Sequence, residues 1–98
     1  MVELLSLAMA DGSRKFGDLP QTKMWNTLRD HIERLDGAEL TSFVCDRVTE
    51  AWIDFRYAGH EFSINDQLAT YWFFVTDPDC PDEILKSVLD HFGELLLT

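Results

Sequence analysis

The apolar, aromatic run Leu68–Val75 constrains the fold of this chain more than any other stretch. It lies between the polar residues Asn65–Gln67 and the pair Asp77-Pro78, and its length suits a strand rather than a helix. Aromatic and β-branched residues also favour strands. One side of the predicted strand carries Ala69, Tyr71, Phe73 and Val75, and the other carries Trp72 and Phe74. Because both sides are apolar, the rest of the chain has to cover this strand.

A first amphipathic helix is predicted from Leu19-Pro20 to Gly37. Proline suits the first position of a helix, and glycine commonly follows the last. Asp18 and Thr22 are alternative capping residues. The apolar stripe comprises Met24, Trp25, Leu28, Ile32 and Leu35.

A second amphipathic helix is predicted from Pro81 onward. Asp82 and Glu83 lie in its first turn, where the helix dipole favours acidic side chains. Cys80 is interpreted as a small N-cap residue. The apolar stripe of this helix comprises Ile84, Leu85, Val88, Leu89, Phe92, Leu95 and Leu96.

Three more strands are predicted between the helices, at Glu39–Cys45, Ala51–Tyr57 and His60–Ile64. Ala58-Gly59 has the composition of a two-residue hairpin turn. Short connections between consecutive strands favour an antiparallel meander. The sequence therefore predicts an α+β, two-layer sandwich of order αββββα: a helix, a four-stranded antiparallel meander and a helix, with both helices on one face of the sheet.

The chain of 98 residues is predicted to form a single domain over residues 18–98, preceded by a flexible or loosely packed segment over residues 1–17. The polar, glycine-bearing stretch Asp11–Gly17 is interpreted as a linker. The two cysteines, Cys45 and Cys80, form no disulfide framework or metal motif, so we expect reduced thiols in the cytoplasm. No signal peptide or membrane-spanning run is evident.

The formal net charge is −10, and most of it lies in the second half of the chain. From Glu50 onward, ten acidic residues face only Arg56 and Lys86. Such a field repels phosphate backbones and anionic membrane surfaces, so neither nucleic acid nor a membrane is expected as a partner. It attracts basic proteins, although acidic residues also simply keep a protein soluble.

No catalytic set, cofactor or metal site is predicted. His60 with Glu61 and Asp54 could act as a general base, but a histidine at a turn is more often only solvated. Cys80 stands at a helix start among acidic residues that disfavour its thiolate. The stretch Asp77–Glu83 could bind Ca²⁺, but helix capping explains its acidic residues equally well. His31 and His91 are expected to be half-buried at the edges of the two apolar stripes.

The strongest functional indication is the aromatic surface of the sheet. Two helices cover one face only, so the second face is covered by residues 1–17, by a partner, or not at all. The residues predicted to bind a partner there are Trp52, Asp54, Arg56, Trp72 and Phe74. The alternative is that these aromatic residues belong to the core.

These features favour a small, non-catalytic protein-binding or adaptor domain that uses an open sheet face, with a protein or a second copy in a homodimer as partner. One alternative is a ligand-binding protein or enzyme with a pocket between sheet and helices, using Asp54, His60 or Tyr71. Another is an acidic inhibitor or chaperone-like protein for a basic partner. In size, charge and order of layers the chain resembles type III secretion chaperones of bacteria. No motif carries this resemblance, so it implies no residue roles.

Overall fold

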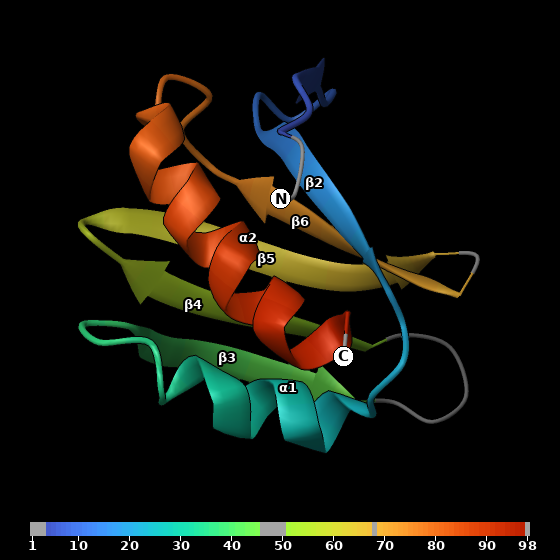
Figure 1. Cartoon of the computed structure of the whole chain (residues 1–98). Helices are drawn as coiled ribbons and strands as arrows, with labels where there is room; N and C mark the ends of the chain where they lie inside the picture. The colour runs from blue at the N-terminus through green and yellow to red at the C-terminus, as the bar shows by residue number, and fades with distance from the viewer. Residues whose placement is uncertain (1–3, 46–50, 68, 98) are drawn as a thin grey trace.

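The computed structural model describes residues 4–45, 51–67 and 69–97. It confirms an α+β fold, in which two helices lie against one six-stranded antiparallel sheet (Figure 1). The strands are β1 (Leu7–Ala8), β2 (Arg14–Pro20), β3 (Glu39–Cys45), β4 (Ala51–Tyr57), β5 (His60–Gln67) and β6 (Thr70–Val75). The helices are α1 (Trp25–Ile32) and α2 (Asp82–Leu96).

The predicted order αββββα is wrong, because two strands precede the first helix. The sheet order is β1-β2-β6-β5-β4-β3, and every neighbouring pair is antiparallel. The four expected strands, β3 to β6, do pair consecutively. Strand β2 pairs with the other edge of β6. It therefore runs in the same direction as β3 at the far edge of the sheet, and α1 connects β2 to β3.

The segment Arg14–Pro20, divided in our prediction between a linker and a helix start, forms β2. Phe16 is fully buried and Leu19 nearly so, and both belong to the core. β1 pairs only with Arg14 and Lys15 of β2, so no described strand lies beside the outer edge of β2 at Pro20. Proline, which has no N–H to donate to a neighbouring strand, is tolerated at such an edge. Proline therefore marks the end of a strand here, not the first turn of a helix.

Helix α1 is shorter than predicted. It begins after Met24, which is 75% exposed and is not part of an apolar stripe. No side chain caps its first turn. Thr22, one of the predicted caps, instead donates its hydroxyl to the Leu96 carbonyl, 2.7 Å away. The buried stripe consists of Trp25, Leu28 and Ile32, in agreement with the predicted spacing.

The meander agrees with the sequence more closely. The hairpin between β4 and β5 turns at Ala58 and Gly59, which have φ values of 54° and 82°. Strand β5 extends to Gln67, beyond the predicted Ile64. The residues predicted to turn at 65–67 therefore pair with β6 instead.

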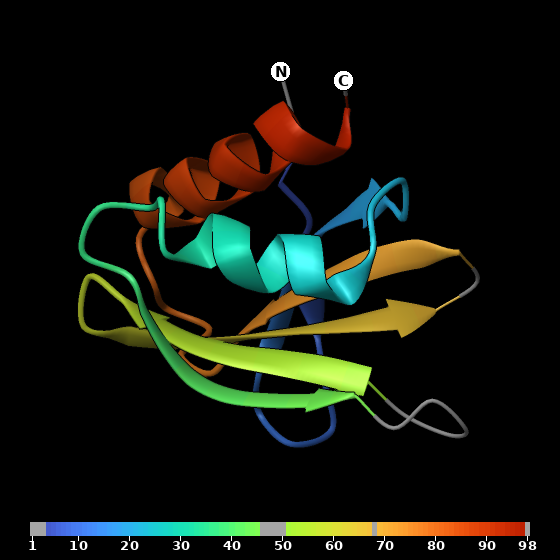
Figure 2. The same ribbon diagram turned by 90° about the horizontal axis from the view of Figure 1, so that it is seen from below.

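Both helices cover the same face of the sheet (Figure 2). Between the two layers lie residues from every predicted element, including Ile53, Phe55, Phe73 and Phe92, each at most 1% exposed. Helix α2 starts at Asp82, and Cys80 before it is buried in the core instead of capping the helix.

Candidate binding surface on the open sheet face

The face of the sheet turned away from the helices is here called the open face. By strand register it carries Lys15, Asp18, Trp52, Asp54, Arg56, Glu61, Ser63, Asn65, Trp72 and Phe74. Trp52, Trp72 and Phe74 are half-buried there, in contrast to Ile53, Tyr71 and Phe73 on the helix-facing side. The predicted division is thus confirmed for Tyr71, Phe73 and Val75 on the core side and for Trp72 and Phe74 on the other. Ala69, predicted on the core side, instead lies exposed in the turn before β6, with a φ of 64°.

Part of the open face is covered by the chain's own N-terminal hairpin. The turn between β1 and β2 hangs below the sheet, on the side without helices (Figure 2). Hydrogen bonds from the Met9 amide to the Ser13 carbonyl and from the Gly12 amide to the Met9 carbonyl close this turn. The hairpin therefore forms a wall beside the aromatic residues instead of a lid over all of them.

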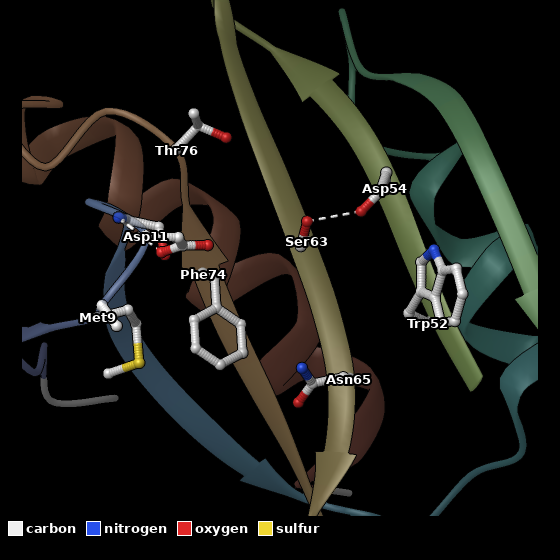
Figure 3. A pocket seen from close by; sticks show the side chains of 10 residues that line it. Met9, Asp11, Trp52, Asp54, Ser63, Asn65, Phe74 and Thr76 are labelled. Carbon is white, nitrogen blue, oxygen red and sulfur yellow. Dashed lines mark hydrogen bonds between the residues drawn. The ribbon is translucent and has the colours of Figure 1, made fainter. Parts of the chain in front are cut away.

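Between this wall and β4 lies a hollow of about 490 Å³. Its lining comprises Met9, Ala10, Asp11 and Ser13 from the hairpin, Trp52 and Asp54 from β4, Ser63 and Asn65 from β5, and Phe74 and Thr76 at the end of β6. The rings of Phe74 and Trp52 stand on opposite sides of β5, with Ser63 and Asn65 between them (Figure 3). The volume lies within the range of small-ligand sites.

Two carboxylates flank the hollow, Asp11 on the hairpin side and Asp54 on the β4 side (Figure 3). Asp11 accepts hydrogen bonds from the Ser13 hydroxyl at 2.6 Å and the Ser13 amide at 3.0 Å. These bonds, the hydroxyl first, hold the pKa of Asp11 below its usual value. Asp54 Oδ1 accepts from the Ser63 hydroxyl at 2.5 Å. In each carboxylate, one oxygen thus already accepts hydrogen bonds from a neighbouring serine.

Asn65 lies between the two tryptophans, paired in register with Trp52 on one side and Trp72 on the other. Its side-chain oxygen is buried and receives no hydrogen bond from the described residues. An unpaired buried acceptor is costly, so this amide is a polar position whose hydrogen bonding the described chain leaves incomplete.

Next to the hollow, the chain's own Lys15 is held on the open face by a ring and a carboxylate. The Lys15 ammonium lies 3.6 Å from the centroid of the Trp72 ring and 3.4 Å from Asp18 Oδ2. Only 6% of Lys15 is exposed. Trp72 itself contacts Phe74, with ring centroids 6.4 Å apart, so the aromatic surface continues from the lysine to the hollow.

Of the five residues predicted to bind a partner, Trp52, Asp54 and Phe74 line this hollow. Trp72 is not in the lining; it contacts Phe74 and is covered by Lys15. Arg56 lies apart from them and pairs with Glu61 across the hairpin at 3.5 Å. Both partners of this pair are more than half exposed, and such pairs contribute little stability.

The residues considered for catalysis do not converge. Asp54 lies on the open face, whereas Tyr71 is fully buried on the opposite side and donates its hydroxyl to the Lys23 carbonyl at 2.6 Å. His60 stands at the hairpin, with its Nδ1 atom 3.7 Å from Asp77 Oδ2. The alternative hypothesis is a pocket between sheet and helices that uses Asp54, His60 or Tyr71, and these three side chains do not share one site.

His31 and His91 form a reciprocal pair between α1 and α2. Their rings are stacked 3.8 Å apart, and each Nε2 hydrogen-bonds the main-chain oxygen of the other histidine, at 2.7 and 2.6 Å. Burial is the main cause that lowers the pKa of His31, and the Arg34 charge lowers it further, whereas the hydrogen bond with the His91 main chain acts in the opposite direction. Both histidines are half-buried, as predicted, and they join the helices.

Burial likewise raises the pKa of the Cys80 thiol, and the neighbouring Asp77 raises it further. The thiol is therefore poorly suited to act as a nucleophile. Among residues 4–45, 51–67 and 69–97, no three histidine, cysteine, aspartate or glutamate side chains are grouped so that they could hold a metal ion.

Sequence reasoning missed the hairpin contribution of Met9, Asp11 and Ser13, and the burial of Lys15 on Trp72. The dipeptide Asp11-Gly12 is a recognised hairpin signal, and it begins the stretch Asp11–Gly17 that we interpreted as a linker. Gly12 has a φ of 89°, as the turn requires.

Comparison with protein-family models, with curated proteins and with solved structures found no match to this chain. No helix in the described part of the chain is long and apolar enough to cross a membrane. The open face is therefore the feature from which a function is inferred.

Proposed function

We propose that the chain is a non-catalytic protein-binding domain of the cytoplasm, which holds a basic segment of a partner protein on its open face. The observation that carries this proposal is the half-buried aromatic surface of Trp52, Trp72 and Phe74 on the side that neither helix covers. Tryptophan and other aromatic residues are enriched at the centres of protein interfaces, where they are anchors of binding energy.

The charge of the surface favours a basic partner. Asp11, Asp18, Asp54 and Glu61 lie on or beside the open face. The cations found there among the described residues, Lys15 and Arg56, are already paired with Asp18 and Glu61. With a net charge of −10, the chain attracts a cationic segment and accelerates its encounter with the surface.

A homodimer through the same face is the second candidate, since exposed aromatic surface also suits self-association. A two-fold axis through this face would bring the acidic residues of both copies together, and like charges in an interface are unfavourable. Sedimentation velocity at about 100 μM, a concentration well above that needed by interfaces of standard size, should therefore show a monomer. If the protein instead forms a dimer, and the substitution Trp72→Thr dissociates it, the partner of the open face is a second copy of the chain and not a basic protein.

The function is tested by capture from the native host followed by footprinting of the captured complex with hydroxyl radicals. We expect the partner to protect Trp52, Trp72 and Met9 from oxidation. Met24, 75% exposed beside α1, is the control and should react equally in the free and bound protein. A partner that protects Met24 and leaves both open-face tryptophans reactive would refute the proposal.

A further inference from the structure

The polar lining of the hollow consists largely of hydrogen-bond acceptors. The carboxylates of Asp11 and Asp54 flank it, and the serine hydroxyls that line it, Ser13 and Ser63, already donate to them. No lysine, arginine or histidine is among the described residues of the lining. The described lining therefore carries no positive charge, and its side-chain donors besides the two serines include the Asn65 amide and the Thr76 hydroxyl. A bound group that supplies positive charge and several donors to the carboxylates is favoured.

The aromatic walls favour the same kind of group. Trp52 and Phe74 stand on either side of the Ser63–Asn65 segment, next to the two carboxylates (Figure 3). A cation over the face of an aromatic ring is attracted by the negative charge of that face, most strongly when the cation is desolvated, and tryptophan is the best partner. The combination of aromatic rings with carboxylates is selective for cations.

The chain itself shows how this chemistry works on the same face. Lys15 packs on Trp72 and pairs with Asp18, so a ring and a carboxylate together hold a cation that is almost completely buried. In the hollow, Trp52 and Asp54 lie on one side of β4 and provide the same combination of an aromatic ring and a carboxylate. The described chain provides no cation for them.

We propose that the hollow is a binding site for the guanidinium group of an arginine side chain in the basic partner. This inference rests on the proposed function and specifies the residue that the surface recognises. Guanidinium is preferred to ammonium because it is planar, stacks on aromatic rings and presents five donors, which can serve two carboxylates on different sides. Met9, Ala10 and Phe74 provide apolar contact for the methylene stem.

The experiment compares two short peptides, acetyl-Gly-Arg-Gly-amide and the same peptide with citrulline. Citrulline has the shape of arginine but no charge. Binding is followed by NMR shifts of the Trp52 indole and the Ser63 and Asn65 amides. We expect saturable binding of the arginine peptide at these positions, and affinity for the citrulline peptide to be at least about tenfold lower, since a hydrogen bond to a charged group contributes that much.

Matched variants assign the binding to the hollow. Asp54→Asn keeps the acceptor for Ser63 and removes the charge, so it should weaken the arginine peptide about fivefold or more. Asp90→Asn, an equal change of net charge on the exposed side of α2, should alter the affinity less than about twofold because screening limits distant charges. If Asp54→Asn perturbs the fold, Asp11→Asn on the exposed turn gives the same test.

Equal affinity for the two peptides, or shifts confined to the acidic segment before α2, would overturn the arginine site. The proposed function would survive that result if the captured partner still protected Trp52 and Trp72. Failure of both measurements would refute both proposals.

Discussion

Substitution of Gly17 by alanine tests how closely β2 packs against α2. Gly17 lies next to a register shift in β2 and pairs with Phe73 on the helix-facing side. A Cβ atom added there would lie 2.5 Å from Leu89 Cδ1 and 2.7 Å from Cδ2, closer than carbon atoms approach in folded proteins. Leu89 is fully buried, so its side chain cannot swing into solvent.

Gly17→Ala should therefore force α2 away from the sheet. Overpacking of a core costs about 1–3 kcal/mol, and the smaller entropy of the unfolded alanine chain returns about 0.4–1 kcal/mol. We expect a net loss of about 1–2 kcal/mol in the free energy of unfolding, measured by urea titration with tryptophan fluorescence. The melting temperature should fall by about 4–8 °C per kcal/mol.

A double-mutant cycle separates this clash from a general effect of glycine replacement. Leu89→Ala removes the atoms that collide, so Gly17→Ala combined with Leu89→Ala should cost clearly less than the sum of the single changes. Gly12→Ala is the matched control. Its φ is 89° and a Cβ there meets nothing within 4 Å, so its cost is backbone strain and should add to that of Leu89→Ala. Additive behaviour of Gly17 and Leu89, or a stabilised Gly17→Ala protein, would refute the packing argument.

Three further predictions concern side chains of the helix-facing layer. Because the pKa of His31 is lowered in the folded protein, the unfolded chain binds more protons, and stability should fall as the pH drops through the ordinary histidine value of about 6.5. Urea unfolding is measured at pH 7.5 and 5.5, about one unit on either side of that value. Between these two pH values the free energy of unfolding should fall less for His31→Gln than for the original chain. Equal losses would contradict the cause assigned to the shift. The raised pKa and burial of Cys80 should make its alkylation by iodoacetamide at neutral pH much slower in the folded protein than in urea, and similar rates would show that the thiol is accessible. Tyr71→Phe removes the hydrogen bond to the Lys23 carbonyl and should cost about 0.5–1.5 kcal/mol in the same urea assay; an unchanged stability would mean that this bond is replaced by another partner.

The parts of the fold that sequence predicts well are those whose pattern is local. The alternation of Ile53 and Phe55 with Trp52 and Asp54 places each set on the correct face, and the stripe of α2 becomes the buried side of that helix. In these segments hydrophobic period and secondary-structure preference agree, so neighbours distant in the sequence are not needed to decide the outcome.

Strand β2 is different, because its own sequence contains a glycine, a proline and three charged residues. Its strand conformation is decided by pairing with β6 and by the burial of Phe16 and Leu19, which only the tertiary structure provides. The same holds for the hollow, which joins Asp11, Asp54 and Phe74 from three distant segments. The aromatic side of the sheet was predictable from alternation, but the wall that the hairpin builds beside it was not.

The central claim is that the open-face aromatic residues serve binding and not folding, and Trp52→Thr tests it most directly. Threonine keeps the strand preference of the position while it removes the ring. Urea unfolding and partner capture are measured on the same variant, with Phe55→Ala on the core side of β4 as the control, which should cost about 3–5 kcal/mol. We predict that Trp52→Thr lowers the free energy of unfolding by only about 1 kcal/mol and abolishes capture of the partner. A loss of stability comparable to that of Phe55→Ala, with capture by the remaining folded protein unchanged, would contradict the account.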